Sequence, residues 1–480
     1  MDSNLKQKTT SGLKWSAIER LATQAIQLVV MLILGRILGP ESVGLIGMLA
    51  VFIALAQVFV DSGFSNALIR KQDRTQLDLS TAYYFNISVA IVCYLILFLA
   101  APYIALFYQQ PLLIDLTRVL GLVVIINGFS IIQRVKLTCD MNFKILAKCS
   151  LIAVLASTAI ALLLAYQGHG PWALIGQSIT FSLVNTILLN FNHKWLPSLA
   201  FSKKSFNYLF SFGSKLLLSG LIDTLYNNIY QIVIGKVFNP KQVGIFTQAN
   251  TLSYIPASSL TSIIQRVTYP MLSKIQDDTN KLNSIYKITL QLSACVIFPI
   301  IMGIAIIAKP LVILILGDTW SEASVLLSIL CIGYMLYPIH SINLNLLQVK
   351  ARTDLFLKLE LIKKLIITLI LLITIPFGIK AICIGIIIQS YLALYLNTYY
   401  TKKIIGLTCY QQFQAVFPIW LITMIIFSLS WQLSQMANNL IMQLVMSIII
   451  TPILYIFAIR YLQPKVFKFI LSTIFKKNIR

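Results

Sequence analysis

Long apolar segments follow one another along nearly the whole of this 480-residue chain. A helix needs about 20 mostly apolar residues to cross a bilayer, and about fourteen segments meet that requirement. Because lipid offers no hydrogen-bond partners to a backbone, such segments must fold as helices. Only 11% of the residues are charged, against about 25% in typical soluble proteins. The sequence therefore predicts an all-α integral membrane protein.

The predicted membrane-spanning helices are 15–38, 41–63, 80–107, 112–134, 145–167, 171–191, 209–236, 241–266, 286–316, 322–347, 358–376, 379–400, 414–434 and 439–462. The first two contain several polar residues, and Pro310 interrupts the ninth. The polar and basic residues 1–14 are not followed by a short apolar stretch with a small-residue cleavage site. We therefore expect the first span to be retained in the protein.

The net charge of +23 has two interpretations, nucleic-acid binding or the positive-inside rule. Most of the 38 Lys and Arg residues fall in the segments that lie on the cytoplasmic side if the N-terminus is inside. Membrane proteins concentrate Lys and Arg in their cytoplasmic loops. The pattern favours an N-in, C-in topology and no nucleic-acid partner.

A short turn occurs twice in the chain, with an offset of 200 residues. It reads GRILGPESVGL at 35–45 and GKVFNPKQVGI at 235–245. The glycine, proline, valine and glycine that recur are Gly35, Pro40, Val43 and Gly44, matched by Gly235, Pro240, Val243 and Gly244. Since six spans separate the copies, both run in the same direction, which indicates a parallel repeat about an axis along the membrane normal. The alternative is that tight membrane hairpins commonly use Gly and Pro.

The repeat predicts two six-helix lobes in parallel pseudo-twofold arrangement. The lobes are 1–200 and 201–405, and 406–480 adds two helices and a basic cytoplasmic tail. Within each turn, Gly39 and Asn239 are residues that tolerate the left-handed conformation that ends a helix. Gly44 and Gly244 are expected to let the following helix approach a neighbour closely.

Polar residues lie inside the first and seventh spans, at helical spacings of three and four. A charged residue at the centre of a span costs about 2.5–3.5 kcal/mol on insertion scales, so Arg20 and Lys215 are candidates for binding an anion. Structural alternatives are snorkelling to the surface and pairing with Glu19 or Asp223. The residues expected to line a shared hydrated cavity are Gln24, Gln27, Ser219, Asn227, Tyr230 and Asn343.

Three acidic residues are candidates for coupling to H⁺ or Na⁺. Asp223 lies deepest in its span, Asp61 lies near the end of the second span, and Glu19 lies beside Arg20. An interfacial cap is the structural alternative for Asp61. His340 near the inner end of the tenth span is interpreted as a core histidine with satisfied hydrogen bonds.

The chain lacks the motifs of the common catalytic and nucleotide-binding sites. It contains no GxxxxGK[ST], HExxH or GxSxG sequence, and its loops are too short to hold a catalytic domain. The seven cysteines are scattered without metal-ligand spacing. We therefore expect no enzyme activity, cofactor, metal site or disulfide.

The segments GLKWSAIERLATQAIQLVVMLILGRILGPESVGLIGM and DSGFSNALIRK resemble the Wzx-type polysaccharide flippases. The similarity is with the branch that exports colanic and teichuronic acids, within the multidrug/oligosaccharidyl-lipid/polysaccharide exporter superfamily. This resemblance implies that undecaprenyl-pyrophosphate-linked oligosaccharides cross the bacterial inner membrane by alternating access, for capsule, O-antigen or exopolysaccharide synthesis. It also implies a cationic cavity, which fits Arg20 and Lys215 by position, and a polysaccharide polymerase and chain-length regulator as partners.

Three other functions are open at this point. A multidrug or cation antiporter of the same superfamily would have a cavity dominated by acidic residues. A lipid II flippase would share the count of fourteen spans, whereas many Wzx proteins are described with twelve. A membrane-bound polymerase or ligase would need a large outer loop, which the chain lacks.

Overall fold

The computed structural model describes residues 3–464 together with 467 and 468, with side chains from Trp15 onward except that of residue 17. These residues form helices joined by short connections, and no strand occurs among them. The predicted all-α architecture is therefore confirmed. The chain divides into two compact units, 1–244 and 245–480, which we call the first and second units and describe separately.

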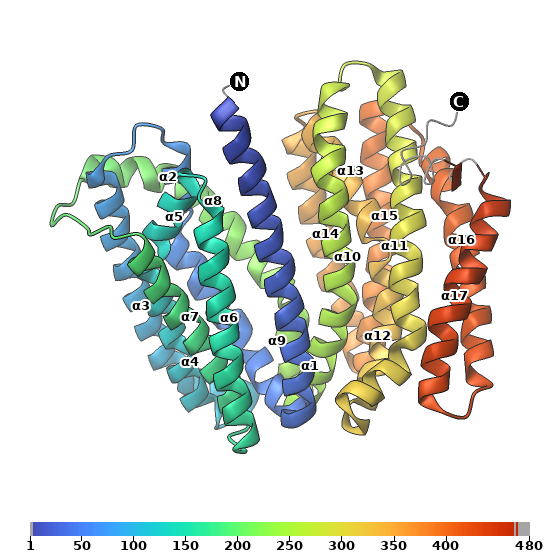
Figure 1. Ribbon diagram of the computed structural model, residues 1–480, viewed down its shortest axis with the longest axis horizontal. Coiled ribbons are helices and arrows are strands. Elements are labelled where there is room, and N and C mark those ends of the chain that lie inside the picture. Colours follow the sequence, from blue (N-terminus) through green and yellow to red (C-terminus); the bar gives the residue numbers. More distant parts are fainter. Residues whose placement is uncertain (1–2, 465–466, 469–480) are drawn as a thin grey trace. The chain divides into compact units, whose positions relative to one another are not determined.

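The helices of the first unit are coloured from blue to green in Figure 1. They are α1 (Ser3–Asp61), α2 (Phe64–Arg70), α3 (Gln76–Tyr108), α4 (Leu113–Gly128), α5 (Ile131–Cys139), α6 (Phe143–Tyr166), α7 (Trp172–Asn192), α8 (Lys203–Asn227) and α9 (Ile229–Val237). Two predicted spans are each divided between two helices, since 112–134 covers α4 and α5 and 209–236 covers α8 and α9. The helix α10 (Pro240–Lys274) begins in the first unit and continues into the second.

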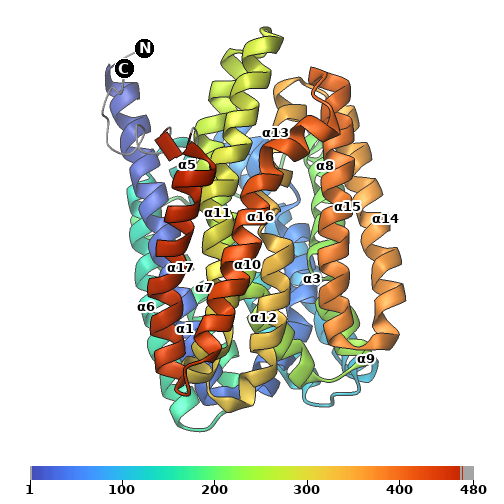
Figure 2. The same cartoon turned by 90° about the vertical axis from the view of Figure 1, so that its right-hand side faces the viewer.

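The second unit contains the remaining helices. They are α11 (Thr279–Leu316), α12 (Ser321–Tyr334), α13 (Tyr337–Val349), α14 (Thr353–Thr374), α15 (Ile379–Ile405), α16 (Cys409–Gln435) and α17 (Leu440–Leu462), with short 3₁₀ turns at Asp318–Trp320 and Ile375–Phe377. The helix α11 continues through Pro310, where the sequence suggested an interruption. The last two helices, α16 and α17, run side by side and pack against α11 (Figure 2), where Tyr455 donates a hydrogen bond to the carbonyl oxygen of Cys295 at 3.1 Å.

Ten helical segments of the described residues are long and apolar enough to cross a membrane. One of them, Ile18–Arg70, includes the first two predicted spans. The predicted spans 209–236, 241–266 and 358–376 are not among the ten, and each contains charged residues along with further polar ones. The structure thus establishes a multi-pass helical protein, while the count of fourteen spans and the N-in, C-in orientation stay predictions.

The repeated turn has two different backbones. Gly39 joins the two halves of α1 with φ 72° and ψ 173°, a combination that is open essentially only to glycine. Asn239 does not have a positive φ. Among the described non-glycine residues, only Ser62, Gln109, Met141 and Ala351 have one. The side-chain oxygen of Asn239 instead accepts a hydrogen bond from the backbone N–H of Gln242 at 2.9 Å. Asn239 therefore does not use the left-handed conformation that it tolerates, because its side chain caps the start of α10 instead.

The two copies of the turn contact each other within the first unit. A Cβ atom placed on Gly44 would collide with the carbonyl oxygen of Pro240, and one placed on Gly244 would collide with the carbonyl oxygen of Pro40. The hypothetical Cβ of Gly44 would also lie 2.9 Å from the amide nitrogen of Gly244, and the reverse distance is 3.1 Å. The close approach expected of both glycines is confirmed, and the neighbour of each is the other copy of the turn.

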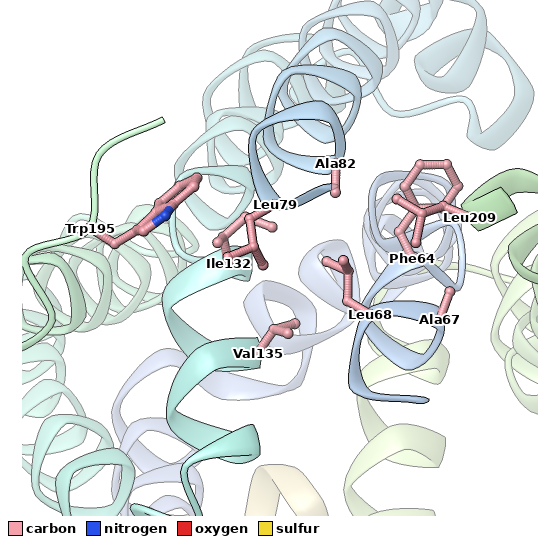
Figure 3. Close-up of a cluster of buried hydrophobic side chains, with 9 residues drawn as sticks. All are labelled: Phe64, Ala67, Leu68, Leu79, Ala82, Ile132, Val135, Trp195 and Leu209. Carbon is pink, nitrogen blue, oxygen red and sulfur yellow. The ribbon is translucent and has the colours of Figure 1, made fainter. Parts of the chain in front are cut away.

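One end of the first unit is held by a cluster of buried side chains that several helices contribute (Figure 3). The cluster consists of Phe64, Ala67, Leu68, Leu79, Ala82, Ile132, Val135, Trp195 and Leu209. Trp195 belongs to the segment between α7 and α8, and its indole N–H donates to the side-chain oxygen of Gln76 at 2.6 Å. This contact fixes the segment between the two sequence repeats against the start of α3.

Candidate functional site

The polar residues predicted in the seventh span lie on one face of α8. Lys215, Ser219, Asp223 and Asn227 follow one another at intervals of four residues, and all four are exposed. Tyr230 follows in α9, beyond a break at Asn228, and is half-buried. The four-residue spacing places the first four residues in a row along α8, which we call the α8 polar row.

The face of α8 that carries Gly213 and Gly220 packs against the end of α1 and the turn that follows it. Gly213 is so close that a Cβ atom there would collide with the carbonyl oxygen of Ser62, and a Cβ on Gly220 would lie 3.1 Å from Val58. Small residues permit such close approach between membrane helices. Because α8 advances about 100° per residue, Lys215 at the start of the row lies on the side opposite Gly213 and Gly220, while Asp223 and Asn227 lie progressively closer to the glycine face.

The first half of α1 carries the other predicted residues. Arg20 and Gln27 are exposed, and Gln24 is half-buried. Glu19 accepts a hydrogen bond from the hydroxyl group of Ser150 in α6 at 2.8 Å. The structure therefore gives Glu19 a partner on α6, where pairing with Arg20 was the alternative drawn from the sequence.

The structure places Arg20 and Lys215 in the same compact unit. Both are exposed, but Val58 and Ser62, against which α8 packs, belong to the second half of α1 and the turn after it, whereas Arg20 lies in the first half. Arg20 and Lys215 thus belong to the same unit, and both side chains are accessible to an anion. The assignment of that role to the two residues stays a prediction.

The three acidic candidates occupy different environments. Asp223 is exposed within the α8 polar row. Asp61 is the last residue of α1, is half-buried, and accepts a hydrogen bond from the hydroxyl group of Ser65. The N-cap of α2 is Gly63, without a side-chain cap hydrogen bond, so the capping role of Asp61 stays a prediction. Glu19 accepts the hydrogen bond from Ser150 described above.

Asn343 departs from the expectation that it lines an open cavity. It is only 1% exposed. Its side-chain oxygen accepts hydrogen bonds from Tyr286 and Thr401, each at 2.7 Å, and its amide group donates to the carbonyl oxygen of Ile339 at 2.8 Å. The side chain of Asn343 is thus fully hydrogen-bonded within a buried network between α11, α13 and α15. The prediction that Asn343 lines an open cavity is therefore wrong. The sequence cannot show this, because the partners lie 57 and 58 residues away.

His340 is hydrogen-bonded through both ring nitrogens. Its Nε2 lies 3.0 Å from the hydroxyl group of Ser390, and its Nδ1 lies 3.0 Å from the amide nitrogen of Asn397. Since Ser390 donates its own proton to the carbonyl oxygen of Gly333, Nε2 is the ring nitrogen that donates to Ser390. The interpretation of His340 as a satisfied core histidine is confirmed.

A polar face on α10 was missed in the sequence reading. Within the second unit its members are Thr247, Asn250, Thr251, Tyr254, Ser258, Thr261, Ser262 and Gln265. Their spacings of three and four place them on one side of the helix. The spacing of three and four can be read from the sequence. It was not recognised because the prediction of site residues started from charged residues, and none of these residues is charged.

The described residues contain no group of three or more His, Cys, Asp or Glu side chains that could hold a metal ion. All seven cysteines are free thiols.

Comparison with known proteins gives a consistent result. The sequence profile of a family described as "Polysaccharide biosynthesis protein" matches residues 33–325. The chain is 29% identical over 425 residues to the lipopolysaccharide biosynthesis protein WzxC of Escherichia coli (strain K12), covering 87% of this chain and 85% of that protein. It is 26% identical over 354 residues to the teichuronic acid biosynthesis protein TuaB of Bacillus subtilis (strain 168), covering 73% of each.

The fold is similar to that of a solved membrane transporter. The structure of the lipid II flippase MurJ in an inward closed conformation superposes with a TM-score of 0.74, covering 94% of this chain and 99% of that one. The two sequences are only 14% identical, so the likeness concerns the fold alone.

Proposed function

This chain belongs to the polysaccharide biosynthesis protein family, and from that premise we propose that it is a flippase for the lipid-linked repeat units of a surface polysaccharide. It is a multi-pass transporter of the bacterial inner membrane and not an enzyme. The observation that carries the proposal is the exposed α8 polar row, together with exposed Arg20 on α1. Such side chains are costly against lipid, so they suit a hydrated path for a polar head group.

In this proposal the substrate is an undecaprenyl-pyrophosphate-linked oligosaccharide that crosses by alternating access. The pyrophosphate carries negative charge, and an unpaired charge crosses hydrocarbon at very high cost. Arg20 would bind it through the planar guanidinium group and Lys215 as a point charge. Gln24, Gln27, Ser219, Asn227 and Tyr230 would supply hydrogen bonds to the same head group.

We further propose that Asp223 is the residue that couples transport to H⁺ or Na⁺. It lies on the same face as Lys215, eight residues further along α8. Asp61 and Glu19 are the other two candidates, and Ser65 and Ser150 donate hydrogen bonds to them. A polysaccharide polymerase and a chain-length regulator are the expected functional partners.

The test is a flipping assay in proteoliposomes with an undecaprenyl-pyrophosphate oligosaccharide. Arg20→Ala and Lys215→Ala should each lower the initial rate by about tenfold or more, because a hydrogen bond to a charged group contributes about 1.5–3 kcal/mol. Lys148→Ala is the matched control, since Lys148 is also exposed but lies on α6. Normal rates for both variants would refute the anion-site assignment.

The same vesicles separate the competing functions. Lipid II as the preferred lipid would indicate a lipid II flippase, and uptake of an organic cation without lipid flipping would indicate an antiporter. For coupling, Asp223→Asn should remove the acceleration produced by an imposed pH or Na⁺ gradient while leaving slow, gradient-independent flipping. Retained acceleration would exclude Asp223 as the coupling residue.

A further inference from the structure

Three tyrosines form a compact group in the second unit, on α10, α12 and α13. The ring centroid of Tyr254 lies 5.4 Å from those of Tyr334 and Tyr337, with interplanar angles of 60° and 85°. The hydroxyl groups of Tyr254 and Tyr337 lie 3.3 Å apart. This edge-to-face packing is a favourable geometry for aromatic pairs, so the group holds Tyr254 in a defined orientation.

Hydrogen bonds from the α10 polar face reinforce this arrangement. The Tyr334 hydroxyl donates to the side-chain oxygen of Asn250 at 2.6 Å. Further along the same face, the amide group of Gln265 donates to the hydroxyl of Ser341 and to the side-chain oxygen of Asn345 at 3.3 Å. A polar seam therefore runs between α10 and α13.

Tyr254 is 38% exposed although it lies in the middle of α10. Its neighbours on the polar face, such as Asn250 and Ser258, are half-buried. A row of hydroxyl and amide groups on a helix that the sequence predicts to span the membrane is expected to face protein or a water-filled cavity and not lipid. The partly exposed ring of Tyr254 is therefore presented to a polar environment.

The seam carries no formal charge. Residues 245–265 contain no Asp, Glu, Lys or Arg, and neither do residues 334–349. A site for pyrophosphate would need basic groups, and a site for a metal or organic cation would gain from acidic ones. A neutral surface of aromatic rings, amides and hydroxyls instead suits a ligand that is itself neutral, partly apolar and rich in hydroxyl groups.

We propose that Tyr254, supported by Tyr334, Tyr337 and Asn250, is a sugar-recognition subsite for the oligosaccharide head group. A pyranose ring offers an apolar C–H face that packs on an aromatic ring, and hydroxyl groups that match side-chain amides and phenols. This inference rests on the proposed flippase function and adds a second subsite, for sugar, in a different unit from the charged residues Arg20 and Lys215.

The test measures binding of two lipids to the full-length protein in nanodiscs. One is the lipid-linked oligosaccharide extracted from the native membrane, and the other is undecaprenyl pyrophosphate without sugar. Tyr254→Ala should weaken binding of the first by about tenfold, equivalent to about 1.4 kcal/mol, and leave binding of the second unchanged. Tyr254→Phe keeps the ring and should stay within about threefold of the parent.

The matched control is Tyr461→Ala. Tyr461 is 63% exposed on α17, also in the second unit, and packs on Phe457 with ring centroids 4.5 Å apart. This variant should bind both lipids like the parent. Melting temperatures of all variants in nanodiscs check that the fold is kept.

The outcomes are distinguishable. The sugar subsite would be overturned if Tyr254→Ala bound the lipid-linked oligosaccharide as tightly as the parent, or if it lost affinity for both lipids equally. Either result would leave the flippase proposal standing. A Tyr254→Phe variant as weak as Tyr254→Ala would also overturn stacking as the basis of recognition. A parent protein that binds neither lipid would overturn the flippase proposal itself.

Discussion

The turn at 35–45 and its copy at 235–245 have four identical residues but different backbones at the connecting position. Gly39 uses a positive φ between the halves of α1, whereas Asn239 caps α10 with its side chain. Both copies keep the glycine that contacts the other copy's proline carbonyl. The difference shows that the contact between the copies requires glycine at positions 44 and 244, where a side chain would collide with the other copy. The residue that connects the two helices, by contrast, can be glycine with a positive φ or an asparagine that caps the next helix.

The reciprocal contact also answers why the chain contains the turn twice. Each copy supplies the surface against which the other packs, as in an interface related by a twofold axis. Pro40 and Pro240 present carbonyl oxygens, and the opposing glycines leave room for them. A change on one side of this contact should therefore resemble the same change on the other side.

The largest expected effect comes from Gly44→Ala and Gly244→Ala. Each added methyl group would collide with a backbone carbonyl group that cannot rotate away, and we expect a loss of about 3 kcal/mol in stability for each. Thermal unfolding in detergent measures the loss. Gly303→Ala is the control, because a Cβ there would meet only Phe427, at 3.8 Å. If one of the two glycines tolerates alanine, the contact is not reciprocal.

A smaller effect is expected for Gly39→Ala. No atom lies within 4 Å of a Cβ at this position, so the cost arises only from the backbone conformation and should be about 2 kcal/mol. The same melting experiment applies. A variant that melts like the parent would show that the turn relaxes to another conformation without loss.

Asn239→Ala should cost about 1 kcal/mol, since it removes the side-chain cap from the Gln242 N–H. Asn239→Asp keeps an acceptor oxygen and should restore most of that stability. Equal melting temperatures for the alanine and aspartate variants would argue against the cap. Together with Gly39→Ala, this pair tests whether the two copies use different local solutions.

The smallest effect is expected at Lys236. Its ammonium group donates to the carbonyl oxygen of Phe107 at 2.8 Å and lies 4.6 Å from the centroid of that residue's ring. Lys236→Met should lower stability by about 0.5 kcal/mol, because the cation–π contact is at an exposed site. Lys236→Arg should melt like the parent, and a large loss for either variant would assign Lys236 a role beyond this contact.

Much of the fold was predictable because the bilayer restricts a chain so strongly. Apolar length predicts helices, and the all-α architecture followed from it. The division of the predicted span 112–134 at Phe129 was not predicted, since apolar residues continue on both sides of the break. The division of 209–236 at Asn228 was not predicted either, although it coincides with two consecutive asparagines. At the site, helical spacing predicted the α8 polar row, but it could not distinguish exposed Asn227 from buried Asn343.

The sequence by itself determined the membrane character of the protein and the two copies of the turn, because these depend on local composition and on short motifs. Only the tertiary structure decided which polar side chains are hydrogen-bonded to other helices. Tyr286 and Thr401 bury Asn343, and Ser150 engages Glu19. It also decided that Gly44 and Gly244 contact each other's turns, since a contact between residues 200 positions apart depends on how the helices pack and not on either segment alone.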